Sequence, residues 1–240
     1  QNRQRPLTLV SAPAGYGKSV LLSSWLEKCD CPHAWFSADE SDNDLRQFLI
    51  YFLTAVRTLF PDALEKTLVL ANTGNMPPTK VLAASLINEL NLIDQDYILA
   101  VDDMHLIQEK QVFDLLTELL QYPPQHMHLV LIGRRDPFLP ISSFRARGLI
   151  TEIRLQDLCF IPAETKTYLD QVLEEPIEDA VAAEGHRCAA AEIRTDPAGA
   201  AVGGDDALEL AAHVALGDAR AFAEVARLAL FPFVALAVAA

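Results

Sequence analysis

Residues 7–19 have the sequence LTLVSAPAGYGKS, and this stretch decides the expected fold. Leu7–Val10 combines apolar and β-branched side chains, which predicts a short buried strand. The next residues include Pro and two Gly, and a helical pattern begins at Ser19. A glycine-rich loop between a strand and a helix is a setting in which backbone N–H groups bind phosphate. The stretch therefore predicts an α/β domain with a phosphate-binding loop.

Each part of this loop has an expected role. Gly15 and Gly17 let the backbone curl so that successive N–H groups face a β-phosphate, and the following helix adds its positive dipole end. We expect Lys18 to reach the β- and γ-phosphates and the Ser19 hydroxyl to bind Mg²⁺. The candidate nucleotide-binding residues are Ala12, Pro13, Ala14, Gly15, Tyr16, Gly17, Lys18, Ser19 and Val20. Ala12 replaces the first Gly of the strict pattern G-x-x-x-x-G-K-[ST], but we expect binding to survive because Ala is unfavourable there only if φ must be positive.

Four further stretches predict the rest of a parallel sheet. They are mostly apolar, as strands buried on both faces are, and they lie at Ala34–Ala38, Tyr97–Val101, His128–Ile132 and Ile150–Leu155. Helical periodicity occurs over Ser19–Lys28, Asp44–Phe60, Thr79–Leu92 and Glu109–Leu120. Strands that alternate with helices predict a parallel sheet covered by helices.

Charged residues follow two of these predicted strands. Asp102 and Asp103 come directly after an apolar strand, and the strand ends of an open parallel sheet face the ligand crevice. We expect Asp102 to bind Mg²⁺, directly or through water, and Asp103 to orient or deprotonate an attacking water, the alternative being a simple turn. Arg134 is expected to sense the γ-phosphate, the alternative being a surface pair with Asp136.

Composition narrows the classes of function. The 240 residues include 19 Lys and Arg against 33 Asp and Glu, and the formal net charge of −14 argues against a nucleic-acid-binding surface over most of the domain. The four Cys form no C-x-x-C pair, which favours reduced thiols and a cytoplasmic protein. Residues 228–240 are apolar but shorter than the roughly 20 residues of a membrane span. We therefore expect no membrane association.

The composition changes after about Leu173. Residues 176–240 are rich in Ala and contain no Lys, with helical periodicity over 207–230. We therefore predict a P-loop NTPase domain over residues 1–160 and an Ala-rich helical extension over 161–240. The extension is either a helical satellite domain or an incomplete or aberrant continuation, for example through a frameshift. Residues 1–6 contain no initiator Met and no signal-peptide pattern, so we expect a segment of a longer protein.

Several motifs together resemble the ATPase module of the MalT-like, large ATP-binding LuxR-type transcriptional regulators. These proteins are AAA-like P-loop NTPases of the STAND class, the signal-transduction ATPases with numerous domains. The resemblance covers about residues 5–173. The motifs are SAPAGYGKSVLL at 11–22 with Trp25, AWFSADESDND at 34–44, Asp102-Asp103 with HLI at 105–107, Arg134 with Asp136-Pro137, RARG at 145–148, and DLCF at 157–160.

The resemblance implies a three-layer sandwich with a five-stranded parallel sheet in the order 5-1-4-3-2. It also implies a switch in which ADP marks the resting state and Mg-ATP the active, self-associating state. Gly133 departs from the Ser or Thr that commonly precedes the sensing Arg, as Ala12 does from the first loop Gly. No Glu-Gly-Trp-type continuation follows Asp179, and the sequence contains no helical-repeat sensor or helix-turn-helix. DNA binding is thus implied only through a domain absent from this segment.

The resulting hypothesis is an ATP-binding, slowly ATP-hydrolysing regulatory switch module of a transcriptional activator. Catalysis is assigned to Asp103 and Arg134, and Mg²⁺ binding to Ser19 and Asp102. Two alternatives remain. One is a nucleotide-independent protein-interaction scaffold with a vestigial loop, and the other is a small-molecule phosphotransferase.

Overall fold

The computed structural model describes residues 5–159, 163, 164, 166 and 167. Of these, residues 5–12 and 29–154 form one compact unit, and residues 13–28 belong with those after 154 to a second unit. The first unit is built on a five-stranded parallel sheet in the order β2-β3-β4-β1-β5. This order confirms the one implied by the family resemblance. The expected helical extension lies almost wholly outside the described residues.

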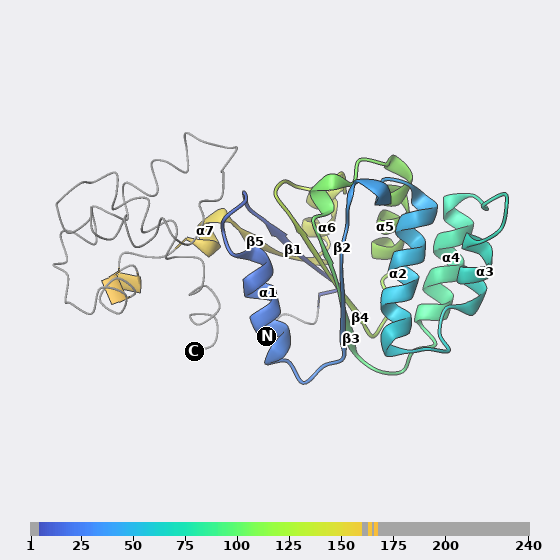
Figure 1. Ribbon diagram of the computed structural model, residues 1–240, viewed down its shortest axis with the longest axis horizontal. Helices are drawn as coiled ribbons and strands as arrows, with labels where there is room; N and C mark the ends of the chain where they lie inside the picture. The colour runs from blue at the N-terminus through green and yellow to red at the C-terminus, as the bar shows by residue number, and fades with distance from the viewer. Residues whose placement is uncertain (1–4, 160–162, 165, 168–240) are drawn as a thin grey trace. The chain divides into compact units, whose positions relative to one another are not determined.

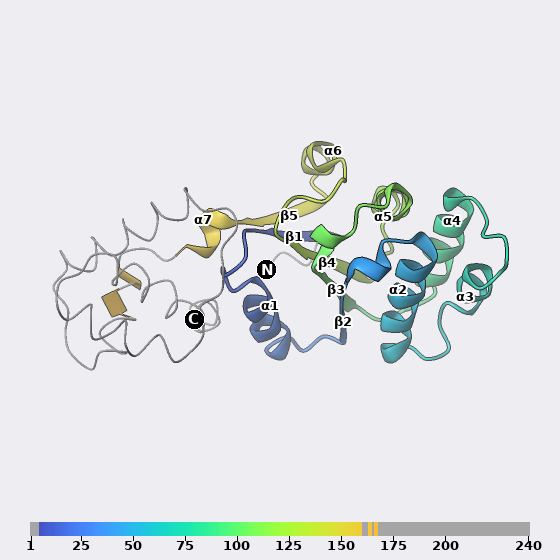
Figure 2. The same ribbon diagram turned by 45° about the horizontal axis from the view of Figure 1, so that its top comes forward.

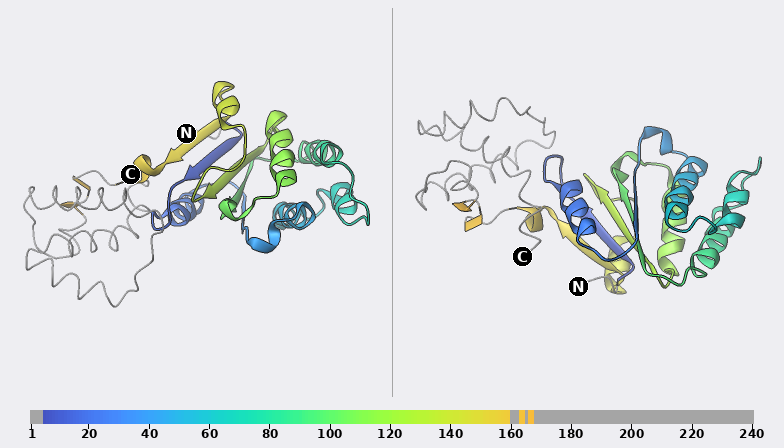
Figure 3. Two further views of the ribbon diagram at one scale, coloured as in Figure 1. Left: turned by 90° about the horizontal axis from the view of Figure 1, so that it is seen from above. Right: turned by 60° about the horizontal axis from the view of Figure 1, so that its bottom comes forward.

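The strands begin and end within about one residue of the predicted positions. They are β1 (Leu7–Ser11), β2 (His33–Ser37), β3 (Tyr97–Asp102), β4 (Met127–Gly133) and β5 (Ile150–Arg154). Figure 3 shows β5, β1 and β4 as neighbouring arrows that point the same way. The register places Ser11 between Gly133 and Arg154, and it places Asp102 opposite Ser37. The carboxyl ends of the strands therefore bring polar residues to one edge of the sheet.

The predicted helices form, and shorter ones lie between them. The helices expected from periodicity are α1 (Lys18–Glu27), α2 (Leu45–Leu59), α4 (Thr79–Leu90) and α5 (Lys110–Gln121). The others are α3 (Glu65–Ala71), α6 (Ile141–Ala146), α7 (Leu155–Leu158) and the 3₁₀ turns η1 (Glu40–Asp42) and η2 (Met104–Leu106). Helices α2 to α5 lie on the same side of the sheet (Figure 1). The described helices are all too short or too polar to span a bilayer.

The hydrophobic core lies between this helical layer and the sheet. Every residue of β3 and of β4 is buried, as expected for central parallel strands. Phe48 and Phe52 of α2 are at most 1% exposed, and Phe48 meets the ring of Phe36 edge-on at 5.9 Å. The apolar side chains of α2 and α5 recur at three- and four-residue spacing, so each helix buries one face.

The short helix α3 is capped by a side chain from α4. The Glu89 carboxylate accepts hydrogen bonds from the backbone N–H of Lys66 at 3.0 Å and of Thr67 at 2.8 Å. These donors lie in the first turn of α3 and have no partner within the helix. The carboxylate therefore both satisfies them and joins the two helices.

Replacing Asp44 tests how much its N-cap hydrogen bond stabilises α2. Its carboxylate accepts from the Gln47 N–H at 3.0 Å, so we expect Asp44→Ala to lower the free energy of unfolding by about 1 kcal/mol. Urea denaturation of the two proteins measures the difference. Asp62→Ala removes an exposed carboxylate and should change little. Equal losses in the two variants would contradict the capping role.

Candidate functional site

From Pro13 onward the expected phosphate-binding loop belongs to the second unit, and its two glycines have left-handed backbone conformations. Gly15 has φ of 88° and Gly17 has φ of 61°, both in the left-handed region that glycine adopts without steric cost. Helix α1 begins directly after Gly17. The Lys18 Nζ donates a hydrogen bond to the Pro13 carbonyl at 2.6 Å, so its ammonium group folds back over the loop. Ser19 is exposed in the first turn of α1.

Ala12, at the first position of the motif, lies in the first unit and causes no backbone strain. It is 3% exposed, and its N–H donates to the Gly133 carbonyl at 3.3 Å. Among the described residues other than glycine, only Leu64 and Asp103 have positive φ. A Gly at position 12 is therefore not required by the backbone conformation.

Two carboxylates of different exposure lie at the carboxyl end of β3. Asp102 is 6% exposed, and its Oδ1 accepts from the Asp103 N–H at 2.7 Å. Asp103 has φ of 55°, which turns the chain sharply into η2, and its side chain is 46% exposed. His105 Nδ1 lies 3.7 Å from Asp103 Oδ1. A carboxylate is the kind of oxygen ligand that Mg²⁺ prefers, and the side chain of Asp103 is more accessible to water than that of Asp102.

Arg134 lies just beyond β4, the strand next to β3. Its side chain is exposed and makes no hydrogen bond or ion pair with any other residue in the described part of the chain. The alternative expectation, a surface pair with Asp136, is therefore wrong, since Asp136 pairs with Arg154 instead. A Cβ at position 133 would lie 3.1 Å from the Arg135 carbonyl oxygen, so Gly133 allows a tight approach there.

Comparison with known proteins finds similar transcriptional regulators. The HTH-type transcriptional regulator MalT of Cronobacter sakazakii is 33% identical over 175 residues, and that of Serratia proteamaculans is 34% identical over 173 residues. Each match covers 72% of this chain and 19% of the relative, so the chain spans about a fifth of the length of these regulators. Over this region the chain is therefore similar to one part of the MalT regulators. No protein-family model matches the sequence.

Solved structures similar to this chain share little sequence with it. Cdc6p from Pyrobaculum aerophilum is 14% identical with a TM-score of 0.43, and the match covers 76% of this chain and 48% of Cdc6p. The Aeropyrum pernix ORC1 protein, solved in complex with DNA, is 15% identical with a TM-score of 0.39, and the match covers 93% of this chain and 53% of ORC1.

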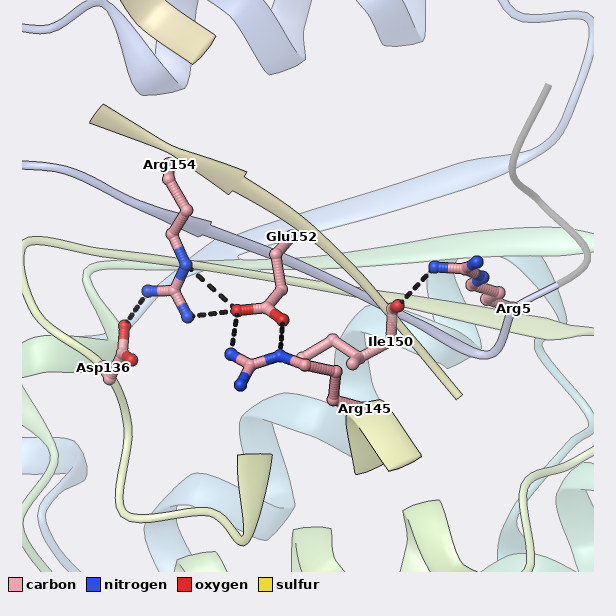
Figure 4. Close-up of polar contacts among 6 residues, drawn as sticks. All are labelled: Arg5, Asp136, Arg145, Ile150, Glu152 and Arg154. Atoms are coloured by element: carbon pink, nitrogen blue, oxygen red, sulfur yellow. Dashed lines mark hydrogen bonds and ion pairs between the residues drawn. The ribbon is translucent and has the colours of Figure 1, made fainter. Parts of the chain in front are cut away.

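The first unit also contains an ion network that no sequence motif indicated (Figure 4). Glu152 of β5 accepts from Arg145 Nε at 2.7 Å and Nη2 at 2.9 Å, and it also accepts from Arg154. Arg154 in turn donates to Asp136. Glu152 and Arg154 share one face of β5 because side chains alternate along a strand. The alternation along β5 could have predicted that Glu152 and Arg154 share a face. It could not have predicted their partners Arg145 and Asp136, which come from other elements.

The network shifts the titration of its carboxylates. The hydrogen bonds from Arg145, together with those from Arg154, lower the pKa of Glu152 to about 2 despite its partial burial. Burial raises the pKa of Asp136, but hydrogen bonds from Arg154 and Ser11 outweigh it and leave this pKa below its ordinary value. Both carboxylates are therefore ionised at neutral pH, which holds β5, α6 and the loop after β4 together.

Glu152→Gln tests this network through the pH dependence of stability. The pKa of Glu152 falls from 4.5 to about 2 on folding, so its stabilising effect is complete above about pH 5 and is lost as the pH falls toward 2. We expect the variant to be less stable than wild type at pH 7, with a difference that shrinks below pH 4.5. Urea denaturation between pH 7 and pH 3 measures it. The exposed Glu27→Gln serves as the control, and a difference that stays constant with pH would contradict the role.

Proposed function

We propose that the domain binds ATP with Mg²⁺, hydrolyses it slowly and acts as a regulatory switch. The observation that carries this proposal is the pair of left-handed glycines, Gly15 and Gly17, placed directly before α1. Such a backbone turns successive N–H groups toward one point, and the helix adds its positive dipole end, so the loop suits a phosphate group. Lys18, folded over the same loop, would add a charge-assisted hydrogen bond to the β- and γ-phosphates.

The chemistry of hydrolysis is assigned to the carboxyl edge of the sheet. In this proposal Ser19 and Asp102 bind Mg²⁺, which would neutralise charge on the β- and γ-phosphates. Asp103, with a side chain that is 46% exposed, would orient the attacking water and accept its proton. The exposed guanidinium of Arg134 would donate to the γ-phosphate, and hydrolysis would remove this acceptor.

A slow reaction fits a switch, because loss of the γ-phosphate need only reset an element with two states. We assign the switch to a transcriptional activator, since the similar proteins are named HTH-type transcriptional regulators. The net charge of −14 favours DNA contact through another part of that protein. Self-association in the ATP state and a cytoplasmic location complete the proposal.

Lys18→Ala tests nucleotide binding. Hydrogen bonds to charged groups contribute about 1.5–3 kcal/mol, so we expect Mg-ATP to bind roughly 10- to 100-fold more weakly. Isothermal titration calorimetry measures the affinity. Lys28→Ala removes an exposed lysine just after α1 and should leave the affinity unchanged. Equal ATP affinities in wild type and Lys18→Ala would exclude both ATP-based functions and favour the protein-interaction scaffold.

Asp103→Asn tests the proposed base. Asn tolerates the left-handed backbone at this position, so the fold should persist. We expect phosphate release to fall about 10²- to 10⁴-fold while ATP affinity stays within about threefold of wild type. Asp114→Asn, on the exposed face of α5, is the matched control. Wild-type phosphate release without an added acceptor distinguishes the switch from a phosphotransferase, and undiminished release by Asp103→Asn would exclude Asp103 as the base.

A further inference from the structure

The turn that carries Asp103 is connected to the loops that follow both neighbouring strands. On one side, Asn43 Oδ1 accepts hydrogen bonds from the backbone N–H of Gln108 and of Glu109, each at 2.7 Å. On the other side, Arg135 Nη2 donates to the His105 carbonyl at 3.1 Å. Figure 2 shows the blue turn after β2 next to the green turn after β3. Contacts from both sides therefore hold the segment from Asp103 to Glu109.

This segment depends on such contacts because it is short and turns sharply. Asp103 adopts a left-handed conformation, which Asp and Asn tolerate better than most residues with a side chain. The following η2 contains three residues and has no side-chain cap at its start. Its internal hydrogen bonds include Leu106 N–H to the Asp103 carbonyl at 2.9 Å. The direction of the Asp103 side chain therefore depends on what holds the far end of the segment.

Asn43 is itself held in place by two adjacent caps. In η1, the Asp42 carboxylate accepts from the Asp39 N–H at 2.8 Å, and the Asp39 carboxylate accepts from the Ser41 N–H at 2.6 Å. Asp42 is 2% exposed, so this turn is anchored in the fold. The next residue after Asn43 is Asp44, which caps α2. Asn43 therefore presents its amide oxygen from a fixed backbone.

We infer that Asn43 is a positioning residue for ATP hydrolysis, acting through the Asp103 turn. The inference rests on the proposed function. Gln108 and Glu109 immediately precede α5, so their N–H groups receive no partner from the helix itself. Asn43 fixes both of them with one oxygen and thereby sets the distance between the end of β3 and the start of α5. Because this contact lies at the surface, water replaces it when Asn43 is truncated, and the fold survives while the turn loosens.

Three variants test this inference. Asn43→Ala removes the acceptor, Asn43→Asp retains it, and Asn91→Ala removes a similar link at the opposite, amino end of the strands. Asn91 Oδ1 accepts from the Gln125 N–H at 3.1 Å, just before the amino end of β4. We expect kcat for phosphate release to fall about 10- to 100-fold in Asn43→Ala, since small displacements of a catalytic group have effects up to about this size. ATP affinity should stay within about threefold, and Asn43→Asp and Asn91→Ala should keep nearly full activity.

Hydrogen exchange adds a readout that does not depend on activity. The amides of residues 103–109 should exchange faster in Asn43→Ala than in wild type or Asn91→Ala. Unchanged kcat in Asn43→Ala, with a wild type that hydrolyses ATP, would overturn the inference and leave the proposed function intact. A parallel loss of kcat and ATP affinity, or an equal loss in Asn91→Ala, would show a merely structural role. A wild type that releases no phosphate would overturn the proposed hydrolysis itself.

Discussion

The burial of β3 is the constraint on which the carboxyl edge of the domain depends. All six residues of the strand are buried, and β2 and β4 pair with it on either side. A charged side chain in the middle of such a strand would lose its hydration without a compensating partner. A carboxylate is therefore tolerated only where the strand ends. Asp102 occupies that position, and the turn through Asp103 follows because the chain must leave the sheet there.

The loops after β2, β3 and β4 are best understood as one connected surface. Each loop alone is short, and each contributes groups to its neighbour: the Asn43 amide oxygen, the His105 carbonyl and the Arg135 guanidinium. Gly133 has no side chain, and this allows the loops to approach closely. A Cβ there would lie 3.1 Å from the Arg135 carbonyl oxygen and 3.5 Å from the His105 nitrogen. The departure from the family pattern at position 133 is therefore compatible with close packing of these loops.

The elements that the sequence could predict are those that depend on local patterns of residues. The strands and helices α2, α4 and α5 have apolar spacings long enough to specify them, and the loop glycines precede α1 directly. The strand order was available only through the family resemblance. Helix α3 was not predictable locally because it has seven residues and is capped by Glu89 from α4. The contacts of Asn43 were missed for the same reason, since their partners lie 65 and 66 residues away.

The ion network gives a physical reason for the exposed state of Arg134. Asp136 is only two residues away and would be an obvious partner for it, but Asp136 binds Arg154, which Glu152 also holds. Arg154 is 25% exposed, so its attraction to Asp136 is screened less than that of an exposed arginine would be. Because Asp136 is already paired with Arg154, it competes only weakly with an incoming phosphate for the guanidinium of Arg134. The pairing on β5 therefore preserves a positive charge at the end of β4, where the proposed γ-phosphate sensor requires it.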